Sequence, residues 1–445
     1  MSAGLAVLTL LAAPALVGTA STPRTTAGVR WAVGAVMLCL VGVVLHGLGI
    51  SRDAALWALA MLTLAAAVRC AMTMRSIRTS RVDPLLGLGF GLVATAGTLV
   101  VLSQPVNDWD AVAIWYAKTR ALLEWQPLSA TPFPVYPELG PMGWSLVLAI
   151  AGPFAEPVGR LLFLGLYLAW LTSLPLWLPA RPPLRIRLAL ILAVAAYVDF
   201  GKITNGYQDA VVMSVAGLSA MLLGRAIFDV GAEPRAAPGD ERFHAAVGLF
   251  FAGALGAIKV EGTLLGAILV GGWLIAVAIV RGPRFLKPFL PFVGLWIGLT
   301  AVWPLLLAVN GVSFSTFQPG AYATLSADEA LGRLSRLPLI VYLFARMGPW
   351  YVLPIVAAAL TSVAAWRRVP AVRPVVAWLW GCAVAHWLGI VTVFLLTNYD
   401  VDWHVRTALD RLEIQHAFIW PMVTIVSAAA VLRDADQPLP GAATL

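Results

Sequence analysis

The sequence predicts an all-α fold, a polytopic transmembrane helical bundle, and two observations support this prediction. Hydrophobic residues make up 60% of the 445 residues, charged residues only 12%, and the mean hydropathy is +0.86. A typical soluble domain is only about 45–50% apolar. The hydrophobic residues also gather in long runs, and a helix needs about 20 predominantly apolar residues to cross a bilayer.

About thirteen runs are long enough, or nearly long enough, to cross. They cover approximately 3–19, 31–50, 54–73, 84–104, 160–179, 186–200, 208–226, 244–258, 262–280, 288–309, 349–366, 374–397 and 413–432. The first run, in "MSAGLAVLTLLAAPALVGTA" (1–20), resembles a signal peptide in its length and its small residues. It lacks a basic leader, so we expect a retained span.

Basic loops predict the orientation, because cytoplasmic loops carry an excess of Lys and Arg. The five basic loops are "MRSIRTSR" (74–81), "ARPPLRIR" (180–187), 225–243, "RGPRFLK" (281–287) and "WRRVPAVR" (366–373). They share one side only if 139–152 and 338–347 do not cross, and we expect an interfacial helix at each. The N-terminus is then outside, and the C-terminus is on the cytoplasmic side of the inner (plasma) membrane.

In this scheme nearly every acidic residue outside the 229–241 loop and the tail falls on the outer side of the membrane, and nine carboxylates meet there. They are Asp108, Asp110, Glu124, Glu138, Asp209, Glu261, Asp400, Asp402 and Asp410. The positive-inside rule counts only Lys and Arg, so this gathering of acids is a separate observation. It indicates that the outer face is the working face.

The long outer segment contains "NDWDAVAIWYAKTRALL" (107–123). At about 100° per residue, four of its charges fall within an arc of about 160°. They are Asp110, Lys118, Arg120 and Glu124. This pattern predicts an amphipathic helix on the outer leaflet, with Asp108 and Asp110 at its N-terminus. Carboxylates there also suit a helix cap and the helix dipole, so capping is an alternative role.

Three further stretches place polar groups at the same predicted depth. "NGYQDAV" (205–211) carries Asp209, "AIKVEGT" (257–263) carries Lys259 and Glu261, and "NYDVDWHVRTALDR" (398–411) forms a loop before the last span. The candidates in that loop are Asp402, His404, Arg406 and Arg411. Snorkelling or capping is the alternative for Lys259 and Arg411. Together the groups supply a base for an acceptor hydroxyl and positive charge for a departing phosphate, as glycosyl transfer from a lipid phosphate requires.

Several other classes find no support in the sequence. The net charge is +8 but the basic residues form no continuous patch, which disfavours nucleic-acid binding. Cys39, Cys70 and Cys382 show no CxxC spacing, so we expect neither a disulfide framework nor a metal knuckle. His46 and His386 lie inside spans and are expected to be core histidines. Glycine-rich nucleotide motifs and HExxH are absent from the sequence.

These motifs, in their order, resemble the GT-C superfamily of integral-membrane glycosyltransferases. The resemblance is to the bacterial branch similar to dolichyl-phosphate-mannose mannosyltransferases and to the Rgt-type lipopolysaccharide glycosyltransferases. It rests on "DWDAVAIWYAKTRAL", "VYPELGPMGWSL", "GYQDA", "IKVEG" and "YDVDWHVRTALDRLEIQ", spread over about 105–420.

The resemblance implies an inverting, cell-envelope enzyme that takes a sugar from a polyprenyl-phosphate-linked donor on the extracytoplasmic side. The acceptor would be a lipid, a glycan or a protein. Asp110 or Asp108 would be the acid of the first outer loop, Asp209 the second acid, and Lys259 the phosphate-facing lysine. No cofactor is required, because the donor carries one phosphate. A divalent metal at Asp108 and Asp110 remains an alternative.

We therefore expect Asp110 to be the general base, with Asp108 as the alternate and Asp209 orienting the acceptor or tuning the base. Lys259 would hold the donor phosphate together with Arg406 or Arg411. The further candidates are His404 for the phosphate, and Lys118, Arg120, Glu261 and Asp402.

Four domains follow from this interpretation: 1–104 with N-terminal helices, the first three as an accessory bundle; 105–159 with the catalytic acids; 160–432 as the main bundle; and 433–445 as a cytoplasmic tail. The loop 310–336 is expected to act as a lid. A transporter or lipid flippase is the alternative, which predicts internal repeats and interrupted helices at mid-membrane. A non-catalytic scaffold subunit is a third reading.

Overall fold

The computed structural model describes residues 3–22, 25–73, 84–153, 155–177, 184–197, 200–231, 240–313, 326–346, 349–396 and 399–435. Within these ranges the regular structure is entirely helical, which confirms the all-α prediction. Among the described residues, eight helical segments are long and apolar enough to cross a membrane. They are 27–47, 52–72, 84–103, 208–228, 260–281, 283–309, 370–396 and 401–432. The protein is therefore a helical membrane bundle.

The helices follow the apolar runs closely. In the first part of the chain they are α1 (Ala3–Ser21), α2 (Ala27–Gly47), α3 (Arg52–Thr73), α4 (Pro84–Ser103), α5 (Ala117–Leu123), α6 (Leu139–Ala151), α7 (Glu156–Leu171), α8 (Leu184–Tyr197) and α9 (Phe200–Thr204). In the second part they are α10 (Gln208–Gly231), α11 (Asp240–Ile258), α12 (Val260–Arg281), α13 (Leu290–Val309), α15 (Ala327–Arg333), α16 (Leu337–Ala345), α17 (Pro349–Arg368), α18 (Arg373–Leu396), α19 (Val401–His416) and α20 (Ile419–Ala435). Each of the predicted apolar runs overlaps a helix, and the number that cross stays a prediction.

Short turns of other helix types join these elements. The 3₁₀ turns are η3 (Leu128–Ala130), η4 (Leu174–Leu176), η5 (Pro283–Phe289), η6 (Leu334–Arg336) and η7 (Pro370–Val372). A π-helix, η2 (Ala111–Tyr116), leads directly into α5. Of the predicted lid, 310–336, residues 314–325 lie outside the described residues, whereas 327–336 form α15 and η6. Parts of the basic loops and most of the predicted tail also lie outside the described residues.

The N-terminal helices are packed into the bundle. A Cβ atom on Gly18 would lie 1.5 Å from the backbone oxygen of Arg30, and one on Gly34 would lie 1.9 Å from that of Pro14. Only glycine allows the backbones of α1 and α2 to approach this closely, as is common between membrane helices. Both helices also pack against α6 and α7.

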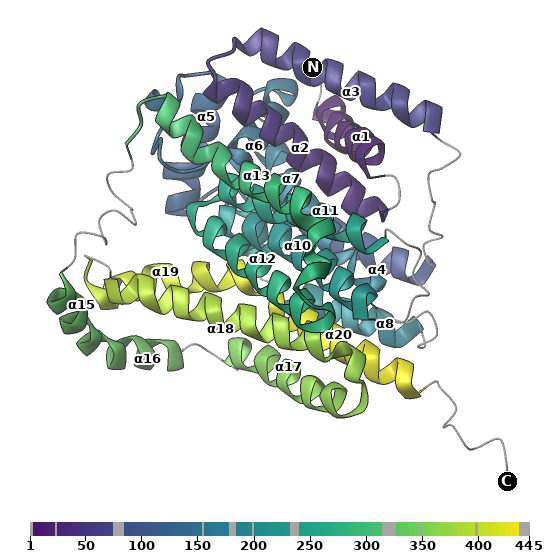
Figure 1. Ribbon diagram of the computed structural model, residues 1–445. Coiled ribbons are helices and arrows are strands. Elements are labelled where there is room, and N and C mark those ends of the chain that lie inside the picture. The colour runs from purple at the N-terminus through teal and green to yellow at the C-terminus, as the bar shows by residue number, and fades with distance from the viewer. Residues whose placement is uncertain are drawn as a thin grey trace.

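Helix α10 lies at the centre of the fold. Most of its side chains are buried, and it packs against α7, α11, α12 and α19. Figure 1 shows α18 running beside the α19–α20 pair, and α17 packs on α20. Because Asp209 lies in the first turn of α10, its carboxylate is held at the end of the central helix.

The prediction of amphipathic interfacial helices in the outer segment is wrong. Lys118, predicted to lie on the charged face, is 0% exposed, whereas the apolar side chain of Val112 is 41% exposed. The π-helix explains the error, because its i→i+5 bonding makes a wider turn than the 100° per residue assumed for an α-helix. Helix α6 is also largely buried, among α1, α2, α5 and α7, and does not lie on the surface.

The segment expected as a loop before the last span is also helical. Helix α19 begins at Val401, and the side chain of Asp400 caps it by accepting a hydrogen bond from Trp403 N at 2.9 Å. Capping, the alternative considered for the acidic residues, is therefore the observed role of Asp400. By contrast α16, within the other segment expected not to cross, has only nine residues and is too short to span a bilayer.

Candidate functional site

Charged and polar side chains from four separate parts of the chain meet beside the first turn of α10. The outer segment gives Asp108 and Asp110; α9 and the turn into α10 give Lys202, Asn205, Tyr207 and Asp209; the α11–α12 junction gives Lys259 and Glu261; and α19 gives Asp410, Arg411 and Gln415. We call this group the charged cluster. Six of the sequence-predicted candidates belong to it.

The most deeply buried part of the cluster is centred on Asp209. Its Oδ1 accepts hydrogen bonds from Lys259 Nζ at 2.7 Å and from the Gln415 side-chain amide at 2.6 Å. Glu261 lies 3.6 Å from the same ammonium group. Burial alone would lower the pKa of Lys259, but the carboxylates of Asp209 and Glu261 outweigh it and raise that pKa, so the lysine stays charged.

A second ion pair joins Asp110 to Arg411, and it is more accessible. The Asp110 side chain is 20% exposed and that of Arg411 is 23% exposed. The guanidinium group also lies 5.9 Å from the centre of the Tyr207 ring, within cation–π range. The predicted base and a predicted phosphate ligand are therefore bound to each other.

The turn between α9 and α10 completes the cluster. Asn205 donates a hydrogen bond to Asp108 through its side-chain nitrogen, and its side-chain oxygen accepts one from Tyr207 N at 3.2 Å. Gly206 has a φ of +95°, a conformation that favours glycine. One turn earlier, Lys202 forms an ion pair with Asp410.

Arg160 holds together the two chain segments that carry Asp108 and Asn205. It is 1% exposed and donates hydrogen bonds to Thr204 O at 2.6 Å, to Val101 O at 3.0 Å and to Gln104 O. These carbonyl groups end α9 and α4, where the chain leaves toward the cluster. Arg160 therefore positions the cluster without belonging to it.

Lys118 lies in a separate buried network, not in the cluster. Its ammonium group donates to Tyr136 O at 2.6 Å and lies 3.7 Å from Glu138. Glu138 in turn lies 3.0 Å from His46 Nδ1, whose other nitrogen contacts Gln126 O at 2.7 Å. Burial lowers the pKa of Lys118 to about 8, although Glu138 opposes the shift. His46, as expected, is a buried histidine with partners.

Four other sequence-predicted candidates lie outside the cluster as defined by its contacts. Arg406 pairs with Asp402 one helical turn away on an exposed side of α19. His404 packs against the rings of Phe394 and Tyr399. Arg120 donates to the carbonyl of Pro153, at the start of the connection to α7.

The cluster also contains residues that the sequence analysis did not select, namely Lys202, Asn205, Tyr207 and Gln415. Asn205 and Tyr207 lie in the same short string as Asp209, so proximity in sequence could have suggested them. Gln415 is uncharged and Lys202 follows an apolar run, so the sequence pattern does not indicate either residue as a site candidate. Close by, Glu413 is 3% exposed, and neither of its carboxylate oxygens has a hydrogen-bond partner in the described structure.

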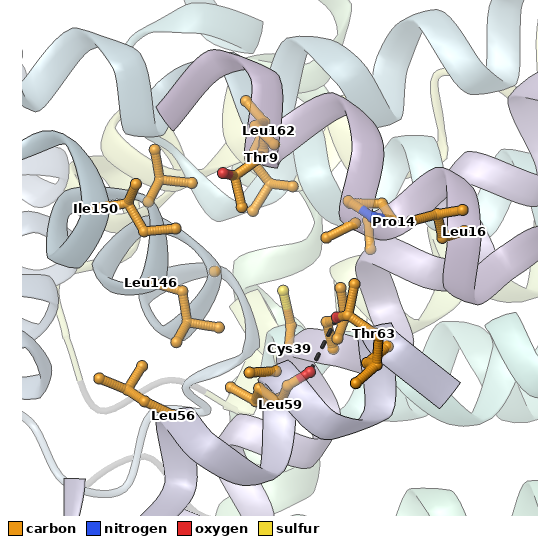
Figure 2. A pocket seen from close by; sticks show the side chains of 18 of the residues that line it. Thr9, Pro14, Leu16, Cys39, Leu56, Leu59, Thr63, Leu146, Ile150 and Leu162 are labelled. Atoms are coloured by element: carbon orange, nitrogen blue, oxygen red, sulfur yellow. Dashed lines mark hydrogen bonds between the residues drawn. The ribbon is translucent and has the colours of Figure 1, made fainter. Parts of the chain in front are cut away.

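Among the residues that the structure describes, no group of three or more His, Cys, Asp or Glu side chains is arranged to hold a metal ion. A cavity of about 540 Å³ lies between α1, α2, α3, α6 and α7. Figure 2 shows its apolar lining, including Pro14, Cys39 and Leu146; the Thr63 hydroxyl on its wall is bonded to Leu59 O at 2.9 Å. This cavity carries no charged side chain.

Comparison with protein-family models, with curated protein sequences and with solved structures gives no match. The charged cluster is therefore the basis for inferring the function of this chain. Its chemistry consists of carboxylates that can accept protons and cations that can bind an oxyanion, side by side.

Proposed function

We propose that the protein is an inverting, GT-C-type glycosyltransferase that moves a sugar from a polyprenyl-phosphate-linked donor to a lipid, glycan or protein acceptor. The observation that supports this is the convergence of Asp108, Asp110, Asp209, Lys259 and Arg411, which are far apart in the sequence. A base and two cations in one cluster are what displacement of a phosphate by a hydroxyl requires.

In the proposed reaction, Asp110 takes the proton from the acceptor hydroxyl, and the acceptor oxygen forms a bond to the anomeric carbon. The bond between that carbon and the phosphate oxygen breaks, and its electron pair leaves with polyprenyl phosphate. Arg411 and Lys259 stabilise the charge on the departing phosphate. Asp209 holds Lys259 in place, so its role is to position that cation. Asp108 is the alternate base.

The proposal includes a location. We place the cluster on the extracytoplasmic side of the inner membrane, with about thirteen spans, an outer N-terminus and a cytoplasmic C-terminus, on the basis of the basic loops. A donor with one phosphate needs no metal to bridge phosphates. Activity is accordingly expected to survive a chelator, and loss of activity would instead support the divalent ion at Asp108 and Asp110.

The test is sugar transfer from a radiolabelled polyprenyl-phosphate donor by purified protein in detergent. Asp110→Asn keeps the shape and removes the basicity, and loss of a general base typically lowers the rate by about 10² to 10⁴. Asp53→Asn is the matched control, because Asp53 is an exposed acid in the first turn of α3, outside the cluster.

Full activity in both Asp110→Asn and Asp108→Asn would refute the assignment of a base. An inactive Asp108 variant beside an active Asp110 variant would move the base by two residues. Mass spectrometry of cell-envelope glycans from a deletion strain is the cellular counterpart. An unchanged glycan profile would favour the transporter or scaffold alternatives.

A further inference from the structure

Tyr207 lies where the groups of the charged cluster meet. Burial, followed by the carboxylates of Asp108, Asp209 and Asp410, raises the pKa of Tyr207 to about 12, and Lys259 opposes the shift only in part. The phenol also belongs to the cluster by geometry, because its ring lies 5.9 Å from the Arg411 guanidinium. The phenol is protonated at neutral pH and can therefore donate a hydrogen bond.

The backbone holds Tyr207 in this position. The Asn205 side chain accepts from Tyr207 N, and the positive φ of Gly206 turns the chain between them. A Cβ atom on Gly206 would also lie 3.1 Å from the Trp144 ring, so the turn packs closely against Trp144. This hydrogen-bonded and packed turn therefore fixes the position of the tyrosine.

Within the part of the chain that the structure describes, the Tyr207 hydroxyl has no partner. The ring is only partly buried, and the hydroxyl makes no hydrogen bond with any residue that the structure describes. The face of the same ring lies against the Arg411 guanidinium. The phenol hydroxyl can donate a hydrogen bond, and the neighbouring Arg411 guanidinium carries a positive charge. Together the two groups are suited to an oxyanion, because arginine binds phosphate through two parallel N–H bonds.

The Asp110–Arg411 pair presents a difficulty for the proposed reaction. A carboxylate bound to arginine is a poorer base than a free one, since the cation favours its ionised form. Both side chains are partly exposed, so a ligand can exchange with the pair without opening the core. The Asp209–Lys259 pair is buried and offers no such exchange.

We propose that Tyr207 is a substrate-contacting residue: its hydroxyl donates to the donor phosphate, and its ring keeps Arg411 beside that phosphate, so that the arginine leaves Asp110. This inference rests on the proposed function and adds the way in which its base is released. Asp110 stays paired with Arg411 until the donor arrives. The donor therefore binds before the acceptor is activated.

The test uses the full-length protein in detergent and undecaprenyl phosphate, without any sugar, as the probe. Tyr207→Phe removes only the hydroxyl, and Tyr207→Leu also removes the ring face. A lost hydrogen bond to a charged group corresponds to roughly a tenfold or larger increase in Kd, and we expect a further increase for Tyr207→Leu. Tyr342→Phe is the matched control, because Tyr342 on α16 makes the same kind of contact, 5.6 Å from Arg346.

The outcomes separate this inference from the proposed function. Binding that is weakened in Tyr207→Phe but not in Tyr342→Phe supports the inference. Equal binding by wild type and Tyr207→Phe overturns it and leaves the glycosyltransferase proposal standing. If wild-type protein does not bind undecaprenyl phosphate, both fail. Arg411→Gln provides a second variant and must also weaken binding, since the phosphate is expected to take over this arginine.

Discussion

At the scale of single residues, Asp209 combines a structural and a functional constraint. One carboxylate oxygen accepts two hydrogen bonds, while the other is buried without a partner in the described structure. Removing one member of a buried ion pair leaves an uncompensated charge and is strongly destabilising. Loss of activity in an Asp209 or Lys259 variant would therefore not by itself identify a catalytic role, whereas the accessible pair of Asp110 and Arg411 permits such a test.

Lys118 shows how a charged residue near the site can be structural. In the buried network, Gln126 O can only accept, so His46 Nε2 donates to it. The proton between His46 Nδ1 and Glu138 then belongs to one of these two groups. The network fixes the outer segment to the end of α2, and Lys118 contributes one buried charge to it.

This arrangement leads to a pH-dependent prediction. The pKa of Lys118 is about 8 in the folded protein, against an ordinary value of 10.5. Between these values the unfolded chain holds a proton that the folded chain has lost, so this group makes the unfolding free energy rise with pH. We expect wild type to gain stability relative to Lys118→Met from pH 8 to 10.5. The measurement is the difference in Tm in detergent across that range, and a flat or falling difference would contradict the shift.

At the scale of elements, α19 accounts for much of the cluster. Arg411 and Gln415 are four residues apart and therefore lie on one face of the helix, where one contacts Asp110 and the other Asp209. The sequence identified the charged members of this segment by residue type. It did not show that they form a helix, because charged residues interrupt the apolar run that marks a span.

In the outer segment, the sequence pattern identified residue types but not the directions of the side chains. Residue type was sufficient to select Asp108 and Asp110, since carboxylates are rare in so apolar a chain. The direction of Lys118 was not accessible, because it depends on the π-turn before it and on Glu138, a partner twenty residues away in sequence. Tyr207 was missed because a tyrosine near a membrane surface is ordinarily an interfacial anchor.

The α9–α10 turn supplies a prediction at this scale. Alanine at Gly206 would adopt a left-handed conformation that costs roughly 1–2 kcal/mol, and its Cβ would press on Trp144. The turn should shift and take Tyr207 with it, so binding of undecaprenyl phosphate should weaken. Gly282→Ala is the matched control, because Gly282 has a φ of +84° but open space around it. Equal loss of binding in both variants would show that strain alone is responsible.

At the scale of the whole molecule, the charged cluster has a sidedness that only the membrane can define. The predicted orientation rests on the basic loops, of which the first and parts of 180–187 and 225–243 lie outside the described ranges. Within the described ranges, Asp209 lies in the first turn of α10 and Lys259 immediately precedes α12, so these two residues mark helix ends on one side of the bundle. The helices alone do not show which side of the membrane the cluster faces, because an apolar helix can cross the membrane in either direction.

Cysteine labelling tests this orientation directly. Val112 is exposed beside the cluster, and the protein's own cysteines, Cys39, Cys70 and Cys382, are buried, so background labelling should be low. A membrane-impermeant maleimide applied to intact cells should modify Val112→Cys, and should modify Pro183→Cys only after the membrane is opened. The reverse pattern would place Asp110 and Arg411 on the cytoplasmic side. The acids would then face the opposite leaflet from the proposed donor, and the glycosyltransferase assignment would lose its substrate.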